Sequence, residues 1–347
     1  MRARHILGRL PQAAARFNAG TAAAPGEGVA YVNGLAALLG QPRCPVDTEL
    51  DLRMSFAAVN VPHPAKAKTG GEDSYFACTS TRTFGIADGV GGWIEEGVDV
   101  GEYARHLMRY AHEDLSRVSL DQPANLREAL LAAATRVRGQ HVKGSCTALL
   151  GHLSGSTLGL LNLGDSGALV LRPALRSIPG HERPLLVPRL VFRSCEQTHY
   201  FNCPYQVSSE MTEVEEPDLI RLRLEPGDLV IACSDGVLDN LFDKQIQQIA
   251  GQAMASVWLE NTSSEAGLEE LAVSLATHAQ QVATDETKQD KPTPWSVAAR
   301  SEGLDFPGGK LDDTTVVVAL AGLAADDSNL EAPPAGHLPE LHNFKLS

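Results

Sequence analysis

The sequence predicts an α+β fold, in which antiparallel strands form sheets that are covered by pairs of helices. Short apolar runs that are typical of buried strands recur along the chain, and several of them begin or end on an aspartate. Two stretches with helical periodicity follow one another between the early strands, and two more follow one another between the late strands. Each pair of helices is therefore expected to pack on one face of a sheet.

Length and composition fit an enzyme with one catalytic domain. The chain has 347 residues, 43% of them hydrophobic, which is enough for one large core. A formal net charge of -14, without any run of Lys or Arg, argues against a nucleic-acid surface. No apolar run approaches the roughly 18 residues that a transmembrane span requires. Six cysteines without a Cys-x-x-Cys pair indicate reduced thiols, not a zinc ribbon or a disulfide framework.

The first 26 residues differ from the rest. Arg2, Arg9 and Arg16 recur every seven residues beside an apolar stripe, and no acidic residue precedes Glu27. This composition predicts a mitochondrial presequence over residues 1–26 and hence a location in the mitochondrial matrix; the alternative is a basic tail. Residues 27–52 are expected to form a leader segment, 53–321 the catalytic domain and 322–347 a disordered tail.

The first strands lead into a glycine-rich loop. Alternation predicts a strand over 53–61, then a loop, then a strand over 74–78 that follows Glu72-Asp73. A buried strand over 84–87 ends in Asp88-Gly89-Val90-Gly91-Gly92. Asp-Gly alone is typical of a hairpin turn. A backbone with so few Cβ atoms, however, also lets main-chain groups approach an ion or a phosphate.

Helical periodicity predicts helices over 101–117 and 123–138, and a second pair over 243–258 and 264–282. Between the pairs, a strand is expected over 144–151, followed by a hairpin over 158–171 with Asp165 in its turn. The aromatic residues of 198–207 suggest either a substrate platform or packing beneath a long loop.

Two later strands also carry aspartates at their ends. The run 228–233 is followed by Ser234-Asp235-Gly236 and by Asp239, whereas Asp312-Asp313 precede the run 314–320. If this last strand is antiparallel to the others, Asp88, Asp235 and Asp312 reach the same edge. Together with Asp165 and the pair at 72–73, they would repel one another unless cations lay between them. The pattern therefore predicts a metal site.

Six motifs in order carry a resemblance to a known family. They are Glu72-Asp73, Asp88-Gly89-x-Gly91-Gly92, Gly144-Ser145-x-Thr147-Ala148, Asn162-x-Gly164-Asp165-Ser166, Asp235-Gly236-x-x-Asp239 and Asp312-Asp313-x-Thr315. Over about residues 53–321 the chain resembles the PPM family, the type 2C metal-dependent serine/threonine phosphatases. The loop Phe201-Asn202-x-Pro204-Tyr205-Gln206 and the basic N-terminal residues resemble its mitochondrial branch. The resemblance implies an αββα sandwich, two antiparallel sheets flanked by helix pairs.

The resemblance also implies the roles of individual residues. Asp88 would bridge two Mg²⁺ or Mn²⁺ ions. Asp235 and Asp312 would complete the ligands of one ion, and Glu72 and the Gly89 carbonyl those of the other. Asp73 would lie behind these ligands. Asp165, Asp235 and Asp239 match positions that hold a weaker third ion in some relatives. A water bridging the two ions would attack the phosphorus in line, in phosphoprotein substrates that are expected to be mitochondrial.

The chain departs from the family pattern at two positions. Val90 stands where the family usually has a histidine proposed as the general acid, which predicts slower turnover or protonation by metal-bound water. Lys68 stands where the family has an arginine that contacts the substrate phosphate. A lysine can still bind phosphate, but without the bidentate geometry of arginine.

Two other functions remain open from the sequence. The protein could be an inactive metal-binding relative that acts as a scaffold or regulator, or a dinuclear hydrolase of small phosphoesters. A nucleotide-binding loop at Gly308-Gly309-Lys310 is excluded, because Leu311 stands where such a loop needs Ser or Thr.

Overall fold

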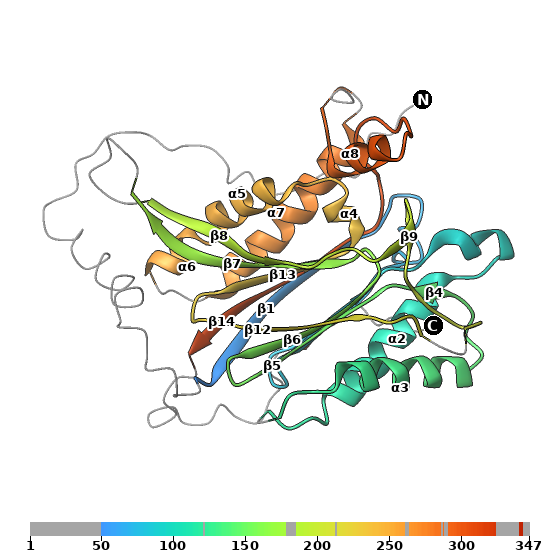
Figure 1. The fold of residues 1–347 in the computed structure, drawn as a ribbon, viewed down its shortest axis with the longest axis horizontal. Helices are drawn as coiled ribbons and strands as arrows, with labels where there is room; N and C mark the ends of the chain where they lie inside the picture. The colour runs from blue at the N-terminus through green and yellow to red at the C-terminus, as the bar shows by residue number, and fades with distance from the viewer. Residues whose placement is uncertain are drawn as a thin grey trace, which may run out of the picture.

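The computed structural model describes residues 50–342, apart from 121, 178–184, 212–213, 261–263, 286, 288–290 and 324–339. The expected presequence at 1–26 and nearly all of the leader at 27–52 lie outside these residues. Within them, two antiparallel sheets are stacked and helices cover both outer faces (Figure 1). The predicted αββα sandwich is confirmed.

The first sheet has five strands and is covered by two helices. Its strands, in spatial order, are β1 (Leu52–Val61), β14 (Thr314–Leu323), β13 (Leu229–Cys233), β7 (Gly167–Arg176) and β8 (Leu185–Arg193). Helices α5 (Asp243–Ala253) and α7 (Ser264–Thr284) lie on its outer face (Figure 1). The short helix α6 (Ala255–Glu260) follows α5, so the helix expected over 243–258 is in fact broken at Met254, which is fully buried.

The second sheet has six strands and carries the other helix pair. Its strands, in spatial order, are β12 (Asp218–Arg223), β6 (Thr157–Leu163), β5 (Ala148–Ser154), β3 (Thr83–Ala87), β2 (Ser74–Cys78) and β15 (Glu340–His342). Helices α2 (Val100–Leu115) and α3 (Leu126–Gly139) pack on it. Each begins at a side chain that accepts a backbone hydrogen bond, Asp99 for α2 and Asn125 for α3.

Short elements complete the fold at one end of the sandwich. They are the 3-10 helix η1 (Gly91–Glu96), the helices α4 (Asp235–Leu238) and α8 (Pro294–Ser301), and two small strand pairs, β4 (Ser145–Cys146) with β11 (Val207–Ser208) and β9 (Thr198–Tyr200) with β10 (Cys203–Pro204). Helices α4 and α8 lie at the same end as β4 and β9 (Figure 1).

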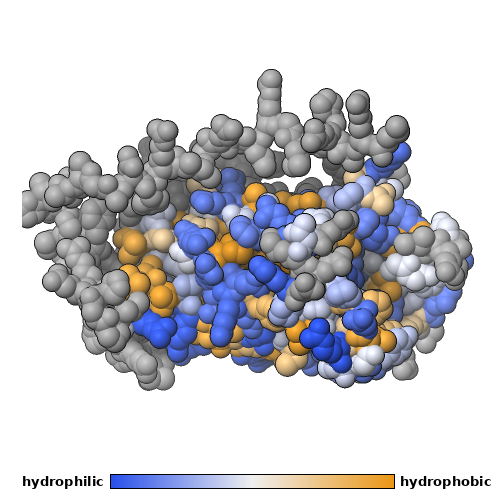
Figure 2. Space-filling model, turned by 90° about the horizontal axis from the view of Figure 1, so that it is seen from above, coloured by the Kyte–Doolittle hydropathy of each residue, from blue (hydrophilic) through white to orange (hydrophobic). Residues whose placement is uncertain are grey.

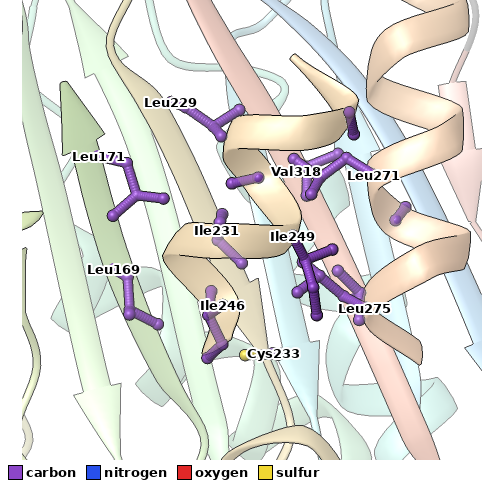
Figure 3. Close-up of a cluster of buried hydrophobic side chains, with 14 of the residues drawn as sticks. Leu169, Leu171, Leu229, Ile231, Cys233, Ile246, Ile249, Leu271, Leu275 and Val318 are labelled. Atoms are coloured by element: carbon purple, nitrogen blue, oxygen red, sulfur yellow. The ribbon is translucent and has the colours of Figure 1, made fainter. Parts of the chain in front are cut away.

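The apolar core forms three layers that match the architecture. One lies between the two sheets, one between the six-stranded sheet and α2 with α3, and one between the five-stranded sheet and α5 with α7. In the last of these, Leu169 and Ile231 on the strands face Ile246 on α5 and Leu275 on α7 (Figure 3). Burial of these side chains holds both sheets rigid beneath the loops at their ends.

The hairpin predicted over 158–171 is wrong. Strand β6 belongs to the six-stranded sheet and β7 to the five-stranded one, so the segment around Asp165 crosses from one sheet to the other. Both strands are largely buried, and a buried strand pattern does not reveal whether its neighbour lies in the same sheet or in the stacked one. Gly164 has a φ of 104°, a conformation that glycine adopts without strain.

The tail expected to be disordered over 322–347 differs from the structure at the residues of it that are described, 322–323 and 340–342. Strand β14 continues to Leu323, and β15 pairs with β2 through Glu340, Leu341 and His342. Strand β2 would otherwise be an edge strand with unpaired backbone groups, and such an edge readily accepts a further short strand.

The outer surface and the thiols agree with the composition. Seen from the side of α5, α7 and α8, hydrophilic and hydrophobic residues are interspersed, as is usual for a layer in contact with solvent (Figure 2). No helix in the described ranges has the length and apolarity needed to cross a membrane. The five cysteines that the structure describes are thiols.

Candidate metal centre

Carboxylates from both sheets converge at one end of the sandwich. Asp88 follows β3 in the six-stranded sheet, whereas Asp235 follows β13 and Asp312 precedes β14 in the five-stranded sheet. Strands β13 and β14 are antiparallel, with Cys233 opposite Val316, which brings their acidic ends together. The carboxylates therefore meet between two stacked sheets, not along the rim of a single one.

Asp88, Asp165 and Asp235 form the tightest group. Each offers a carboxylate oxygen, and these oxygens lie within 4.8 Å of one another. The main chain of Asp88 is held by Thr147, whose N–H donates to the Asp88 carbonyl at 2.9 Å and whose Oγ1 accepts from the Asp88 N–H at 3.1 Å. Thr147 Oγ1 also lies 3.0 Å from Ser166 Oγ, beside Asp165. The Gly-Ser-x-Thr and Gly-Asp-Ser motifs thus position neighbouring carboxylates.

Asp313 holds the loop that carries Glu72 against β14. Its Oδ2 accepts from the Glu72 N–H at 2.7 Å and its Oδ1 accepts from the His63 N–H at 2.5 Å. Asp313 is itself buried. The sequence pointed to Asp312 as a ligand but gave Asp313 no role, because a carboxylate that binds backbone amides is no different in sequence from one that binds a cation.

Glycines let two segments approach closely. A Cβ on Gly236 would lie 2.0 Å from the carbonyl oxygen of Asp313, so α4 can meet β14 only with glycine at this position. A Cβ on Gly89 would lie 2.9 Å from the Glu72 carbonyl oxygen. The expected ligands Glu72 and Gly89 are therefore neighbours, and Asp73, buried beside them, has Asp313 and Asp312 as charged neighbours.

Two lysines enter the cluster, and neither had been given a role from the sequence. Lys66 Nζ lies 2.5 Å from Glu72 Oε2, 3.5 Å from Asp312 Oδ1 and 3.7 Å from Asp313 Oδ2. Lys310 Nζ donates to Asp235 and lies 3.4 Å from Asp312 Oδ2. Only the fold reveals either contact.

Lys68, the residue expected to contact the substrate phosphate, is exposed in the same loop as Lys66. Val90 is half-buried, and its N–H donates to the Ser145 carbonyl at 3.0 Å. Ser145 Oγ also accepts from Trp93 Nε1 at 2.7 Å. The glycine-rich loop and the residue after it are thus held to β4 by one main-chain and one side-chain hydrogen bond.

Burial and like charges raise the pKa of most of these carboxylates. Burial and then the charge of Asp235 raise the pKa of Asp165 to about 7. The same two causes raise the pKa of Asp88 and of Asp239 well above the usual value. Burial opposes ionisation of Asp235 too, but the Lys310 charge lowers its pKa. Because raised pKa values mean unfavourable ionised forms, the cluster gains free energy by taking up cations.

The donor atoms fit a hard divalent cation. Asp165 Oδ1 and Asp235 Oδ1 are buried and make no hydrogen bond to any residue that the structure describes. All the candidate ligands offer oxygen, which suits Mg²⁺ or Mn²⁺ better than zinc. The site can therefore hold such cations on Asp88, Asp165 and Asp235, with Asp312 and Glu72 close by.

Proteins of known sequence and structure resemble this chain. No protein-family model matches it. It is 36% identical over 282 residues to the probable protein phosphatase 2C 55 of Arabidopsis thaliana, which covers 80% of the chain and 53% of the relative. It is 32% identical over 288 residues to the probable protein phosphatase 2C 1 of Oryza sativa subsp. japonica, covering 78% of the chain and 77% of the relative. The protein phosphatase PTC7 homolog fig of Drosophila grimshawi is 34% identical over 266 residues, covering 72% and 78%.

Among solved structures, the photosystem II phosphatase PBCP matches with a TM-score of 0.59 and 27% identity, covering 77% of this chain and 98% of that one. The Mycobacterium tuberculosis serine/threonine phosphatase PstP/Ppp, at 19% identity and a TM-score of 0.51, supports the fold alone; 77% of this chain and 98% of that one are covered. The chain spans about half the length of the first Arabidopsis relatives, 53% and 58%.

Proposed function

The chain belongs to the protein phosphatase 2C family, and we propose that it is a metal-dependent phosphatase that hydrolyses phosphoserine and phosphothreonine in proteins. The reaction is the transfer of a phosphoryl group from the side-chain oxygen to water. Because the chain spans only part of several relatives, its substrates and partners are part of the proposal.

One observation carries the proposal, the unbalanced charge of the cluster. It contains eight carboxylates and two ammonium groups, or a net charge of -6 when all are ionised: Glu72, Asp73, Asp88, Asp165, Asp235, Asp239, Asp312 and Asp313 with Lys66 and Lys310. A stable fold tolerates so many buried and half-buried like charges only where cations offset them.

The chain would hold two Mg²⁺ or Mn²⁺ ions at this place. We assign Asp88 as the shared ligand, with Asp235 and Asp312 toward one ion, and Glu72 and the Gly89 carbonyl toward the other. When bound, the ions would act as Lewis acids that lower the pKa of a water molecule and offset charge on the phosphoryl oxygens. Asp313 would keep Glu72 in place through the loop that it anchors.

The loop at 62–71 would contact the substrate phosphate. Lys68 remains our proposal for this role, and Lys66 is a second candidate because its ammonium group lies at the cluster with 25% of its side chain exposed. Substitution of a lysine that binds the phosphate in the ground state would raise KM, whereas substitution of a lysine that acts only in the transition state would lower kcat. Kinetics of Lys66→Gln and Lys68→Gln therefore assign the contact.

The proposal is tested by turnover of a phosphothreonine peptide with Mg²⁺, with Mn²⁺ and with EDTA. We expect turnover with either ion, none with EDTA, and none in Asp88→Asn. Glu270→Gln, which removes one negative charge from the exposed face of α7, is the matched control and should retain full activity. Turnover that persists in EDTA or in Asp88→Asn contradicts the proposal. Faster turnover of a small phosphate ester than of the peptide would favour the small-phosphoester hydrolase. Cation binding without any turnover would favour the inactive scaffold.

We further propose that the substrates are mitochondrial. Support comes from the composition of residues 1–26, which lie outside the described part of the chain. Imaging of the full chain tagged at its C-terminus tests this proposal, with Arg2, Arg9 and Arg16 replaced by glutamate as the comparison. Mitochondrial fluorescence that is independent of these arginines would remove the support.

A further inference from the structure

The ammonium group of Lys310 contacts three carboxylates of the cluster. Its ammonium group donates to Asp235 Oδ2 and lies 3.2 Å from Asp239 Oδ2 and 3.4 Å from Asp312 Oδ2. Only 18% of the side chain is exposed. Burial disfavours the charged form of Lys310, but the surrounding carboxylates raise its pKa well above the usual value. The ammonium group is therefore held among three carboxylates of the cluster.

The main chain at this position is built to hold the lysine. The Asn240 side chain accepts from the Lys310 N–H at 3.0 Å and donates to the Lys310 carbonyl at 2.8 Å. Asn240 is buried and also donates to the Gly236 carbonyl at 2.9 Å, which ties Lys310 to α4. A Cβ on Gly309 would lie 2.3 Å from Asn240 Oδ1, so this clamp requires glycine before the lysine.

An aromatic ring confines the lysine further. Its Nζ lies 5.1 Å from the centre of the Trp295 ring, within the range of a cation–π interaction. The backbone N–H of Trp295 donates to the backbone carbonyl of Asp239 at 2.9 Å, so the two residues whose side chains face Lys310 are joined through their main chains. Little rotational freedom remains to be lost when the ammonium group meets its partners.

The two oxygens of Asp235 have different surroundings. Oδ2 bonds to Lys310, while Oδ1 is buried without a hydrogen bond in the described ranges and remains available to an ion beside Asp88 and Asp165. Asp239, by contrast, faces the ammonium group. A divalent ion bound to the Oδ2 atoms of Asp235 and Asp239 would have to displace the ammonium group from them.

We infer that the ammonium group of Lys310 takes the place of a third divalent ion at Asp235 and Asp239. The inference rests on the proposed pair of ions at Asp88. It implies that the protein binds two divalent ions and no third, because the charge of Lys310 excludes a third ion.

Native mass spectrometry of the full chain, stripped with EDTA and reloaded with saturating Mn²⁺, counts the ions. We expect two in the wild type, three in Lys310→Gln and two in Lys310→Arg, which keeps the charge. Lys244→Gln removes an exposed lysine on α5 and should leave the count at two. A third ion in the wild type, or a count that stays at two in Lys310→Gln, overturns the inference.

The wild-type count decides the matter even if Lys310→Gln does not fold. If Lys310 occupies the place between Asp235 and Asp239, the Asp239→Asn variant still binds two ions. If an ion occupies it, the wild type binds three ions and Asp239→Asn binds two. A wild type without any bound ion would overturn the proposed centre itself, whereas a wild type with three ions overturns only the role of Lys310.

Discussion

Replacing Asp88 by asparagine should stabilise the metal-free protein and at the same time abolish its response to cations. Asp88 has two carboxylate neighbours, Asp165 and Asp235, with ligand oxygens within 4.8 Å. In the absence of cations these charges repel one another, and asparagine removes one of them at nearly constant volume. With cations present, the same substitution removes the ligand that both ions are proposed to share.

The size of the effect follows from the geometry. Two unit charges 4.8 Å apart repel by about 3.5 kcal/mol at an effective dielectric constant of about 20. Nearby Lys310 and partial protonation weaken this repulsion, so the expected gain is on the order of 2–4 kcal/mol. For a domain of this size about 1 kcal/mol shifts Tm by about 2–4 °C, which gives a rise of about 4–16 °C.

Thermal unfolding at pH 8, with EDTA and with Mn²⁺, measures both parts of the prediction. The wild type should gain about 2.7 kcal/mol for each bound ion when Mn²⁺ is at about 100 times its Kd, whereas Asp88→Asn should gain almost nothing. Glu270→Gln, with the same change of charge on the exposed face of α7, should follow the wild type. A lower Tm of Asp88→Asn in EDTA would refute repulsion as the dominant effect, and a retained response to Mn²⁺ would refute Asp88 as a ligand.

Three further predictions follow from the same cluster. Asp235→Asn should destabilise the metal-free protein by about 1.5–3 kcal/mol in urea unfolding, because it deprives Lys310 of its bonded carboxylate. This effect is opposite in sign to that of Asp88→Asn, and an increase in the free energy of unfolding would contradict the pairing. The metal-free Tm should fall as pH rises from about 4 to about 7, because burial and Asp235 raise the pKa of Asp165 to about 7 and the unfolded chain therefore ionises first; a Tm that rises throughout this range would exclude the effect. Val90→His should raise kcat about tenfold or more by supplying a general acid, and an unchanged kcat would show that the position contributes no acid.

Most of the candidate ligands could be predicted from the sequence, because each lies next to a short strand whose pattern is local. Asp88 and Asp235 directly follow buried strands, and Asp312 lies just ahead of one. Lys310 could not be found in this way. Its position depends on Asn240, which is 70 residues away in sequence, and on glycine contacts that exist only after the chain has folded. Lys66 and Asp313 were missed for the same reason.

The sequence by itself determined most of the strands, the helix pairs and the acidic strand ends, since hydrophobic periodicity and turn residues act over a few positions. It did not predict strands β8 and β12 or helix α8. Only the tertiary structure decided which strands share a sheet. Strands β6 and β7, which the sequence predicted to form a hairpin, belong to different sheets. The short strand β15 pairs with the edge strand β2, and no local sequence pattern predicted this pairing. Stacking of the two sheets then brings Asp88 to Asp235, because contacts between distant segments depend on packing the whole core and not on the residues beside them.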